Sequence, residues 1–258
     1  MERGRGLTAP PLHRSGEGVG GWGFVEGSTM QYRTMGKNGP SVSLLGFGCG
    51  AIGGLLVKGN EGEQKRTVER ALEAGITYFD TAAAYGNGRS EEAIGPLLKE
   101  LNAKVVLGTK FRVEPHEIPN ASAVIRQHIE TSLRRLGWDS VDLFNLHNRI
   151  GSDPSGREGA LSVEDVLGPV AEGLAKVREA GLTRMIGITG LGDTAAVKQV
   201  VASGLYDSVQ TYVNAVNPSA GWGVAGPGIQ NFDNLLDTIA EHGVGAVGIR
   251  VLAAGALA

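Results

Sequence analysis

The chain has little cysteine, no long apolar run and almost no charge imbalance. Its one cysteine excludes an internal disulfide and a cysteine cluster for zinc, so we expect a reducing, cytoplasmic setting and no bound metal. No apolar stretch approaches the roughly 20 residues of a membrane span, so no membrane partner is expected. The formal net charge is -3, from 24 basic and 27 acidic residues interspersed along the chain, which argues against a nucleic-acid partner.

Glycine, by contrast, is abundant. It supplies 41 of the 258 residues, about 16% against a usual ~7%, and many glycines follow expected helices and strands. The pattern indicates a fold with many loops. The length suits one α/β barrel, which needs about 250 residues, although two ordinary domains would also fit.

The chain divides into two parts. Residues 1–29 contain glycine, proline and scattered charge without a hydrophobic period, and they lack the apolar core of a signal peptide, so we expect a disordered extension. Residues 30–258 form the expected barrel domain. At its start, Asn38-Gly39 separates two β-type segments, which predicts a hairpin that closes the bottom of the barrel.

After the hairpin, apolar strand-like runs alternate with amphipathic segments of helical period. Seven strands and six helices are predicted, and the chain ends at Ala258 before an eighth strand. We therefore expect a (β/α)8 TIM barrel without its eighth strand and final helices, in which the first and seventh strands have unpaired edges. The predicted strands are 45–50, 76–81, 104–110, 140–146, 185–189, 208–213 and 244–252, and the predicted helices are 63–74, 195–202, 232–241 and those beginning at Ser90, Asn120 and Ser162.

Polar residues follow or end three consecutive strands. Asp80 ends one strand, Tyr85 follows it by five residues, Lys110 ends the next strand and His147 the one after. Taken singly, each residue could have a purely structural role. These roles are, in the same order, a capping or salt-bridge acid, a loop aromatic, an exposed charge and a buried packing histidine. Together they favour one site, because the carboxyl ends of parallel strands form the ligand-binding face.

The four side chains suit the reduction of a carbonyl group. A tyrosine phenol has a reference pKa of about 10 and needs a neighbouring charge to donate its proton near neutrality. Lys110 would supply that charge, Asp80 would orient Lys110, and His147 would donate to the same substrate oxygen. The hydride must come from a cofactor, because no side chain provides one.

These residues resemble a known family. The run Asp80-Thr81-Ala82 with Tyr85-Gly86, the strand-terminal lysine and histidine, and residues 46–50 (Gly-Phe-Gly-Cys-Gly) are similar to the aldo-keto reductases, and the likeness extends from Met30 to the last residue. It implies an eight-stranded barrel that reduces aldehydes and ketones with NADPH or NADH. It also implies catalytic roles for Asp80, Tyr85, Lys110 and His147. Residues 90–95 and 250–257 resemble a bacterial or plant branch that acts on sugars, so the expected substrate is a small carbonyl compound or a sugar aldose.

The resemblance implies a cofactor site with some departures. Thr189-Gly190 replaces the usual Ser-Asn pair, the position of the stacking aromatic falls near Ile249 or Arg250, and the phosphate-holding loop is expected beyond Ala258. Two functions therefore stand: an NAD(P)-dependent oxidoreductase, or a catalytically silent barrel that acts as a binding scaffold. The expected cofactor contacts are Gly48, Asp80, Thr189, Gln210, Arg250, Leu252 and Gly255.

Two further residues are interpreted from their neighbours. Cys49 is expected to be a buried barrel residue without a reactive thiol, because no activating base is evident nearby. Trp222 is expected to lie in a loop over the top face of the barrel.

Overall fold

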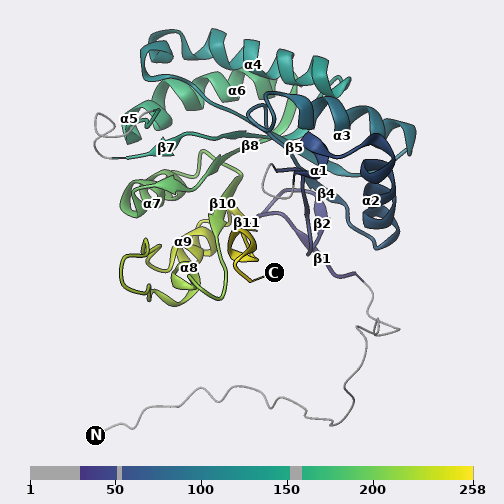
Figure 1. Cartoon of the computed structure of the whole chain (residues 1–258). Coiled ribbons are helices and arrows are strands. Elements are labelled where there is room, and N and C mark those ends of the chain that lie inside the picture. The colour runs from purple at the N-terminus through teal and green to yellow at the C-terminus, as the bar shows by residue number, and fades with distance from the viewer. Residues whose placement is uncertain (1–29, 51–53, 152–158, 258) are drawn as a thin grey trace, which may run out of the picture.

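A parallel sheet with helices outside it forms most of the described chain (Figure 1). The computed structural model describes residues 30–50, 54–151 and 159–257, so the predicted disorder of residues 1–29 lies outside the described residues. The strands are β1 (Tyr32–Thr34), β2 (Ser41–Ser43), β3 (Phe47–Gly48), β4 (Tyr78–Asp80), β5 (Val106–Phe111), β6 (Val141–Leu146), β7 (Arg149–Ile150), β8 (Thr183–Thr189), β9 (Leu191–Gly192), β10 (Ser208–Tyr212) and β11 (Gly245–Ile249).

The helices follow the strands in the order that the sequence predicts. Short 3-10 turns lie at Pro115–Asn120 and Ala253–Gly255, and a π-helical turn at Val166–Val170 separates α5 from α6. The α-helices are α1 (Leu55–Lys58), α2 (Glu61–Glu73), α3 (Arg89–Glu100), α4 (Ala121–Leu136), α5 (Val163–Asp165), α6 (Ala171–Glu179), α7 (Thr194–Ala202), α8 (Ser219–Trp222) and α9 (Leu235–Glu241).

Within the described residues the main sheet has seven strands in the order β11-β10-β8-β6-β5-β4-β3. Each neighbouring pair is parallel. The α/β barrel architecture is therefore confirmed, with β3 and β11 as the edges of an open sheet in the part of the chain described. None of the helices in the described ranges is long and apolar enough to cross a membrane.

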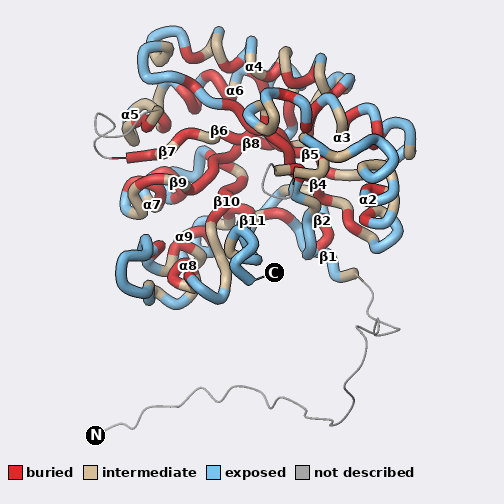
Figure 2. Tube along the Cα trace, in the orientation of Figure 1, coloured by how far each residue is buried: buried red, intermediate tan, exposed pale blue. Residues whose placement is uncertain are grey.

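The core lies between the sheet and its helices, as the buried segments of Figure 2 show. Helix α4 illustrates how the sequence builds it: Ile125, Ile129, Leu133 and Leu136 form one buried stripe. Gly137 then ends the helix in the left-handed region at φ 67°, a conformation that glycine adopts at low cost.

The N-terminal hairpin closes the bottom of the sheet, as predicted. β1 and β2 pair antiparallel, and Met35 packs in a small apolar cluster with Tyr78 and Leu143. The turn reaches the segment just before β11, since Lys37 N donates to Gly243 O at 3.0 Å. The hairpin thus contacts strands near both edges of the open sheet.

Several predicted boundaries are wrong. Helix α3 begins at Arg89 after Gly88, so Ser90 is inside the helix rather than its cap. The predicted helix 232–241 begins at Leu235, because Asp233 and Asn234 have positive φ angles. The last strand ends at Ile249 rather than 252, because Arg250 has φ 54° and leaves the extended conformation.

Candidate active site

A buried lysine organises the carboxyl ends of β4 and β5. The Lys110 side chain is 0% exposed. Its Nζ donates to Asp80 Oδ2 at 2.6 Å, to the Thr81 carbonyl at 2.7 Å and to Tyr85 Oη at 3.2 Å. Burial lowers the pKa of Lys110, but the charge of Asp80, then that of Tyr85, and hydrogen bonds to both outweigh burial and raise it. The ammonium therefore stays charged beside the phenol.

Asp80 accepts hydrogen bonds on both carboxylate oxygens. Oδ2 takes the lysine, while Oδ1 accepts from Gln210 Nε2 at 2.8 Å and from Tyr78 Oη at 3.2 Å. We call these four side chains, Tyr78, Asp80, Lys110 and Gln210, the Asp80 cluster. A buried ion pair is favourable only when further hydrogen bonds satisfy its remaining polar atoms, and the two additional donors do so here.

The loop after β4 fixes Tyr85. Its ring faces Gly50, where an added Cβ would lie 3.7 Å from ring atoms Cε2 and Cζ. The next residue, Gly86, has φ 62°, and a Cβ there would lie 2.5 Å from Val57 Cγ1. Glycine is therefore required directly after Tyr85, and this accounts for the Tyr-Gly pair in the sequence.

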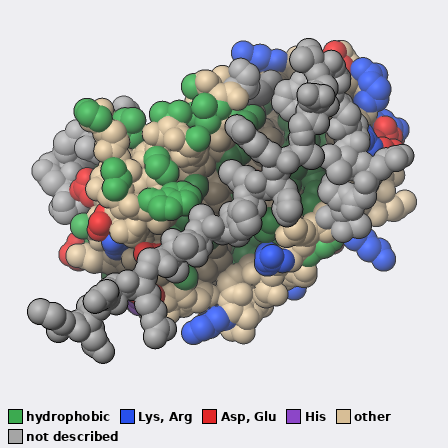
Figure 3. All heavy atoms as spheres, turned by 90° about the horizontal axis from the view of Figure 1, so that it is seen from below, with side chains coloured by type: hydrophobic (Ala, Val, Ile, Leu, Met, Phe, Trp, Pro, Cys, Tyr) green, Lys and Arg blue, Asp and Glu red, His purple; other side chains and the backbone are tan. Residues whose placement is uncertain are grey.

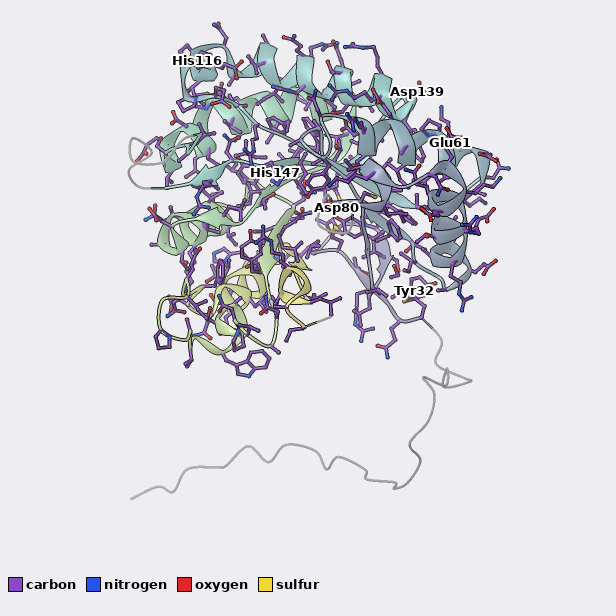
Figure 4. All side chains as sticks on the ribbon, in the orientation of Figure 1. Tyr32, Glu61, Asp80, His116, Asp139 and His147 are labelled. Carbon is purple, nitrogen blue, oxygen red and sulfur yellow. The ribbon has the colours of Figure 1, made fainter. Side chains whose placement is uncertain are left out.

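His147 faces Tyr85 from the end of β6. The two rings meet edge to face, with centroids 6.0 Å apart. Burial, then the charges of Lys110 and Arg112, lower the pKa of His147 to about 3, so the imidazole is neutral at physiological pH. Its Nδ1 is buried without a hydrogen-bond partner among the described residues. In Figure 4 the labels of Asp80 and His147 fall close together near the centre, while Glu61, His116 and Asp139 are peripheral.

The lowered pKa predicts an acid-sensitive fold. Between the unfolded pKa of about 6.5 and the folded value of about 3, the unfolded chain binds a proton that the native state excludes. The stability from neutral His147 is complete above pH 6.5 and falls by up to about 1.4 kcal/mol per pH unit as the pH decreases toward 3. The free energy of unfolding, measured with urea at several pH values across this range, should depend less steeply on pH in His147→Gln than in the wild type. The control is His116→Gln at an exposed position, which should keep the pH dependence of the wild type. An identical pH dependence of stability in the wild type and His147→Gln would contradict the prediction.

A second polar network holds the start of α3, and no sequence motif had pointed to it. Ser90 Oγ donates to the Cys49 carbonyl at 2.9 Å and lies 2.8 Å from Thr81 Oγ1. Glu91 is fully buried; it accepts from Thr109 Oγ1 at 2.6 Å and from Arg135 Nη1 at 3.2 Å. Glu91 lies three and seven residues before Ile94 and Leu98, on the buried stripe of α3.

Cys49 is buried as expected, at 2% exposure. Burial first, and the charge of Asp80 second, raise the pKa of its thiol. The thiol is therefore protonated and a poor nucleophile.

The expected cofactor residues fall into two groups. Gly48, Thr189 and Gln210 lie on strands of the sheet around Asp80. Gly48 pairs with Asp80, and Thr189 pairs with Gln210. An added Cβ at Gly48 would meet no atom within 4 Å among the described residues. Thr189 Oγ1 is buried without a hydrogen-bond partner in the described part of the chain.

The second group, Arg250, Leu252 and Gly255, follows β11 and is exposed. The Arg250 guanidinium lies 4.7 Å from the centroid of the Tyr212 ring at the end of β10. The Arg250 carbonyl accepts a hydrogen bond from Asn214 Nδ2 at 3.2 Å. The structure therefore places Gly48 and Gln210 beside Asp80 and Thr189 beside Gln210, whereas Arg250 lies against Tyr212.

Large apolar side chains are exposed near the end of the chain. Trp222 was expected in a loop, but it ends the short helix α8, and it is 71% exposed. Figure 3 shows hydrophobic side chains gathered in one half of the lower face. The exposed large apolar residues in this region are Val216, Trp222, Val224, Ile229, Val251, Leu252 and Leu257.

The parallel sheet, its outer helices and the strand-end polar residues define an α/β barrel with a candidate active site at the carboxyl ends of its strands. A family model described as the Aldo/keto reductase family matches residues 44–258. The chain belongs to the aldo/keto reductase family.

Three relatives show how far the likeness extends. L-galactose dehydrogenase of Arabidopsis thaliana is 29% identical over 235 residues, which cover 88% of this chain and 67% of that protein. The aldo-keto reductase yakc of Schizosaccharomyces pombe, whose name includes NADP(+), is 29% identical over 157 residues, or 58% of this chain and 43% of that protein. The holo form of aldo-keto reductase AKR11C1 from Bacillus halodurans superposes with a TM-score of 0.65 at 26% identity, covering 85% of this chain and 65% of that one. The chain thus spans about two thirds or less of the length of these relatives.

Proposed function

We propose that the chain is an oxidoreductase that interconverts an aldehyde or ketone with the corresponding alcohol, using NADP(H) or NAD(H). The observation that carries this proposal is the contact of 3.2 Å between Tyr85 Oη and the buried ammonium of Lys110. A buried ammonium at this distance stabilises the negative charge that develops on the phenol oxygen as its proton leaves.

Each side chain then has a defined task. Tyr85 transfers its proton to the carbonyl oxygen in reduction and recovers it in oxidation. Lys110 stabilises the phenolate that remains, and Asp80 holds the lysine in place. His147, neutral because of its low pKa, keeps one N–H to donate to the same oxygen. General acid catalysis of this kind contributes about 10² to 10⁴ in rate.

The residues around Asp80 also fit a nicotinamide cofactor. The carboxamide of nicotinamide both donates and accepts hydrogen bonds. The Thr189 hydroxyl has no hydrogen-bond partner among the described residues, and Gln210, whose Nε2 donates to Asp80, lies on the paired position of the neighbouring strand β10. The hydroxyl of Thr189 and Oε1 of Gln210 would hold that group. The nicotinamide, when bound, supplies or accepts the hydride.

The relatives support a choice of cofactor and substrate to test first. The name of the yeast relative includes NADP(+), so we place NADP(H) before NAD(H). The likeness to L-galactose dehydrogenase supports a sugar aldose as substrate, with oxidation at its aldehyde carbon to the lactone.

The experiment is a fluorescence titration of the purified chain with NADPH and with NADH, followed by assays with a panel of aldehydes, ketones and aldoses. Saturable binding of one cofactor and turnover of a carbonyl or aldose substrate are expected. Absence of binding for both cofactors would favour the other possibility, a catalytically silent barrel that acts as a scaffold.

A further inference from the structure

Tyr78 is a buried phenol directly beneath the candidate catalytic residues. It is 4% exposed and begins β4, two residues before Asp80. Alternate residues of a strand point to the same face of the sheet, so both side chains point into the barrel. The Tyr78 hydroxyl lies 3.2 Å from Asp80 Oδ1.

Two glycines fix the position of the Tyr78 ring. A Cβ added to Gly46 would lie 2.7 Å from Tyr78 Cδ1, so the ring packs directly on the backbone before β3. A Cβ added to Gly108 would lie 3.5 Å from both Tyr78 Oη and Asp80 Oδ1. The ring therefore has little freedom to move its hydroxyl away from the carboxylate.

In the hydrogen bond between Tyr78 and Asp80, the tyrosine hydroxyl is the donor. Burial first, and the charge of Asp80 second, raise the pKa of Tyr78 well above its usual value, so the phenol is protonated and donates. Gln210 Nε2 donates to the same oxygen at 2.8 Å. Asp80 Oδ1 is therefore held from two sides, and Oδ2 is left to accept from Lys110 at 2.6 Å.

We propose that Tyr78 is a positioning residue: its hydroxyl fixes the plane of the Asp80 carboxylate, which in turn directs the Lys110 ammonium toward Tyr85. This inference rests on the proposed function, because it concerns the same site. Lys110 Nζ also donates to Thr81 O and Tyr85 Oη. Rotation of the carboxylate would alter the ammonium geometry at both acceptors, and Gln210 alone would oppose that rotation in the absence of the Tyr78 hydroxyl.

The first test is Tyr78→Phe, which keeps the ring and removes one atom. We expect kcat for carbonyl reduction to fall about tenfold, with KM changed less than about twofold, because the hydroxyl acts on the proton donor and not on substrate binding. The matched control is Tyr206→Phe. Tyr206 is 3% exposed and its hydroxyl donates to Val166 O at 2.6 Å, away from the Asp80 cluster. Tyr206→Phe should lose about as much stability as Tyr78→Phe does, and it should keep the kcat of the wild type.

A second measurement separates this inference from the proposed function. NMR of isotope-labelled lysine ammonium groups should show slow hydrogen exchange at Lys110 in the wild type, because Nζ is buried and donates to three acceptors. Exchange should be at least about threefold faster in Tyr78→Phe and unchanged in Tyr206→Phe. If the wild type reduces no carbonyl compound, the proposed function fails, while the exchange rates still test the positioning of Lys110. Unchanged exchange in Tyr78→Phe, or equal kcat losses in the two variants, would overturn the inference.

Discussion

Replacing Tyr85 with phenylalanine should reduce kcat for carbonyl reduction by about 10²- to 10⁴-fold, the contribution of a well-placed general acid. Phenylalanine keeps the ring that faces Gly50 and His147, and it lacks the hydroxyl that Lys110 contacts. The proton for the product alcohol must then come from water. Cofactor affinity should remain nearly unchanged, because the phenol acts chiefly in the transition state.

The measurement is steady-state kinetics together with a fluorescence titration of the cofactor. Tyr32→Phe is the matched control, since Tyr32 is 43% exposed, its hydroxyl donates to Gly75 O, and it lies away from Asp80 and His147 (Figure 4). It should behave as wild type in both assays. A Tyr85→Phe enzyme that retained kcat within about threefold would show that another group supplies the proton, because general acid catalysis contributes far more than that.

The sequence predicted the strand-end residues because their positions follow from local pattern. Lys110 and His147 end apolar runs, and parallel strands bring such ends to one face. No sequence spacing could show the contact of Gln210 with Asp80, since 130 residues separate them and the pairing depends on how the sheet curves. Gln210 was predicted as a cofactor contact only, and that role stays a prediction.

Tyr78 and Glu91 were missed for different reasons. Nothing in the local sequence distinguishes Tyr78 from an ordinary strand residue. Its proposed role depends on two glycines, distant in the sequence, that enclose its ring. The spacing of Glu91 to Ile94 and Leu98 places it on the buried face of the helix. Acidic residues in a first helical turn, however, are usually exposed and stabilise the helix dipole, so the spacing alone did not indicate burial. Burial instead required a partner on another helix, Arg135, 44 residues away.

Arg135→Met should destabilise the fold by about 3 kcal/mol, because it leaves the carboxylate of Glu91 buried without its cation. The Glu91 side chain is 0% exposed and that of Arg135 is 28% exposed, so some water reaches the arginine and the loss belongs at the low end of the range for buried pairs. Arg135 also packs against the loop that carries Tyr85, since a Cβ on Gly88 would lie 2.6 Å from Arg135 Nε. Urea unfolding at neutral pH measures the loss as a lower midpoint with an unchanged slope.

The double variant Glu91→Gln with Arg135→Met tests the cause. With no buried charge left, and with the glutamine amide still able to bond Thr109, most of the lost stability should return. The control on the same helix is Arg126→Met, whose pair with Glu130 is 58% and 43% exposed and contributes about 0.3 to 0.5 kcal/mol. If Arg135→Met cost no more than Arg126→Met, or if Glu91→Gln gave no recovery, the stability of α3 would not depend on neutralising Glu91. If Arg135→Met were costly and Glu91→Gln gave no recovery, packing of the arginine against Gly88 would be its main contribution.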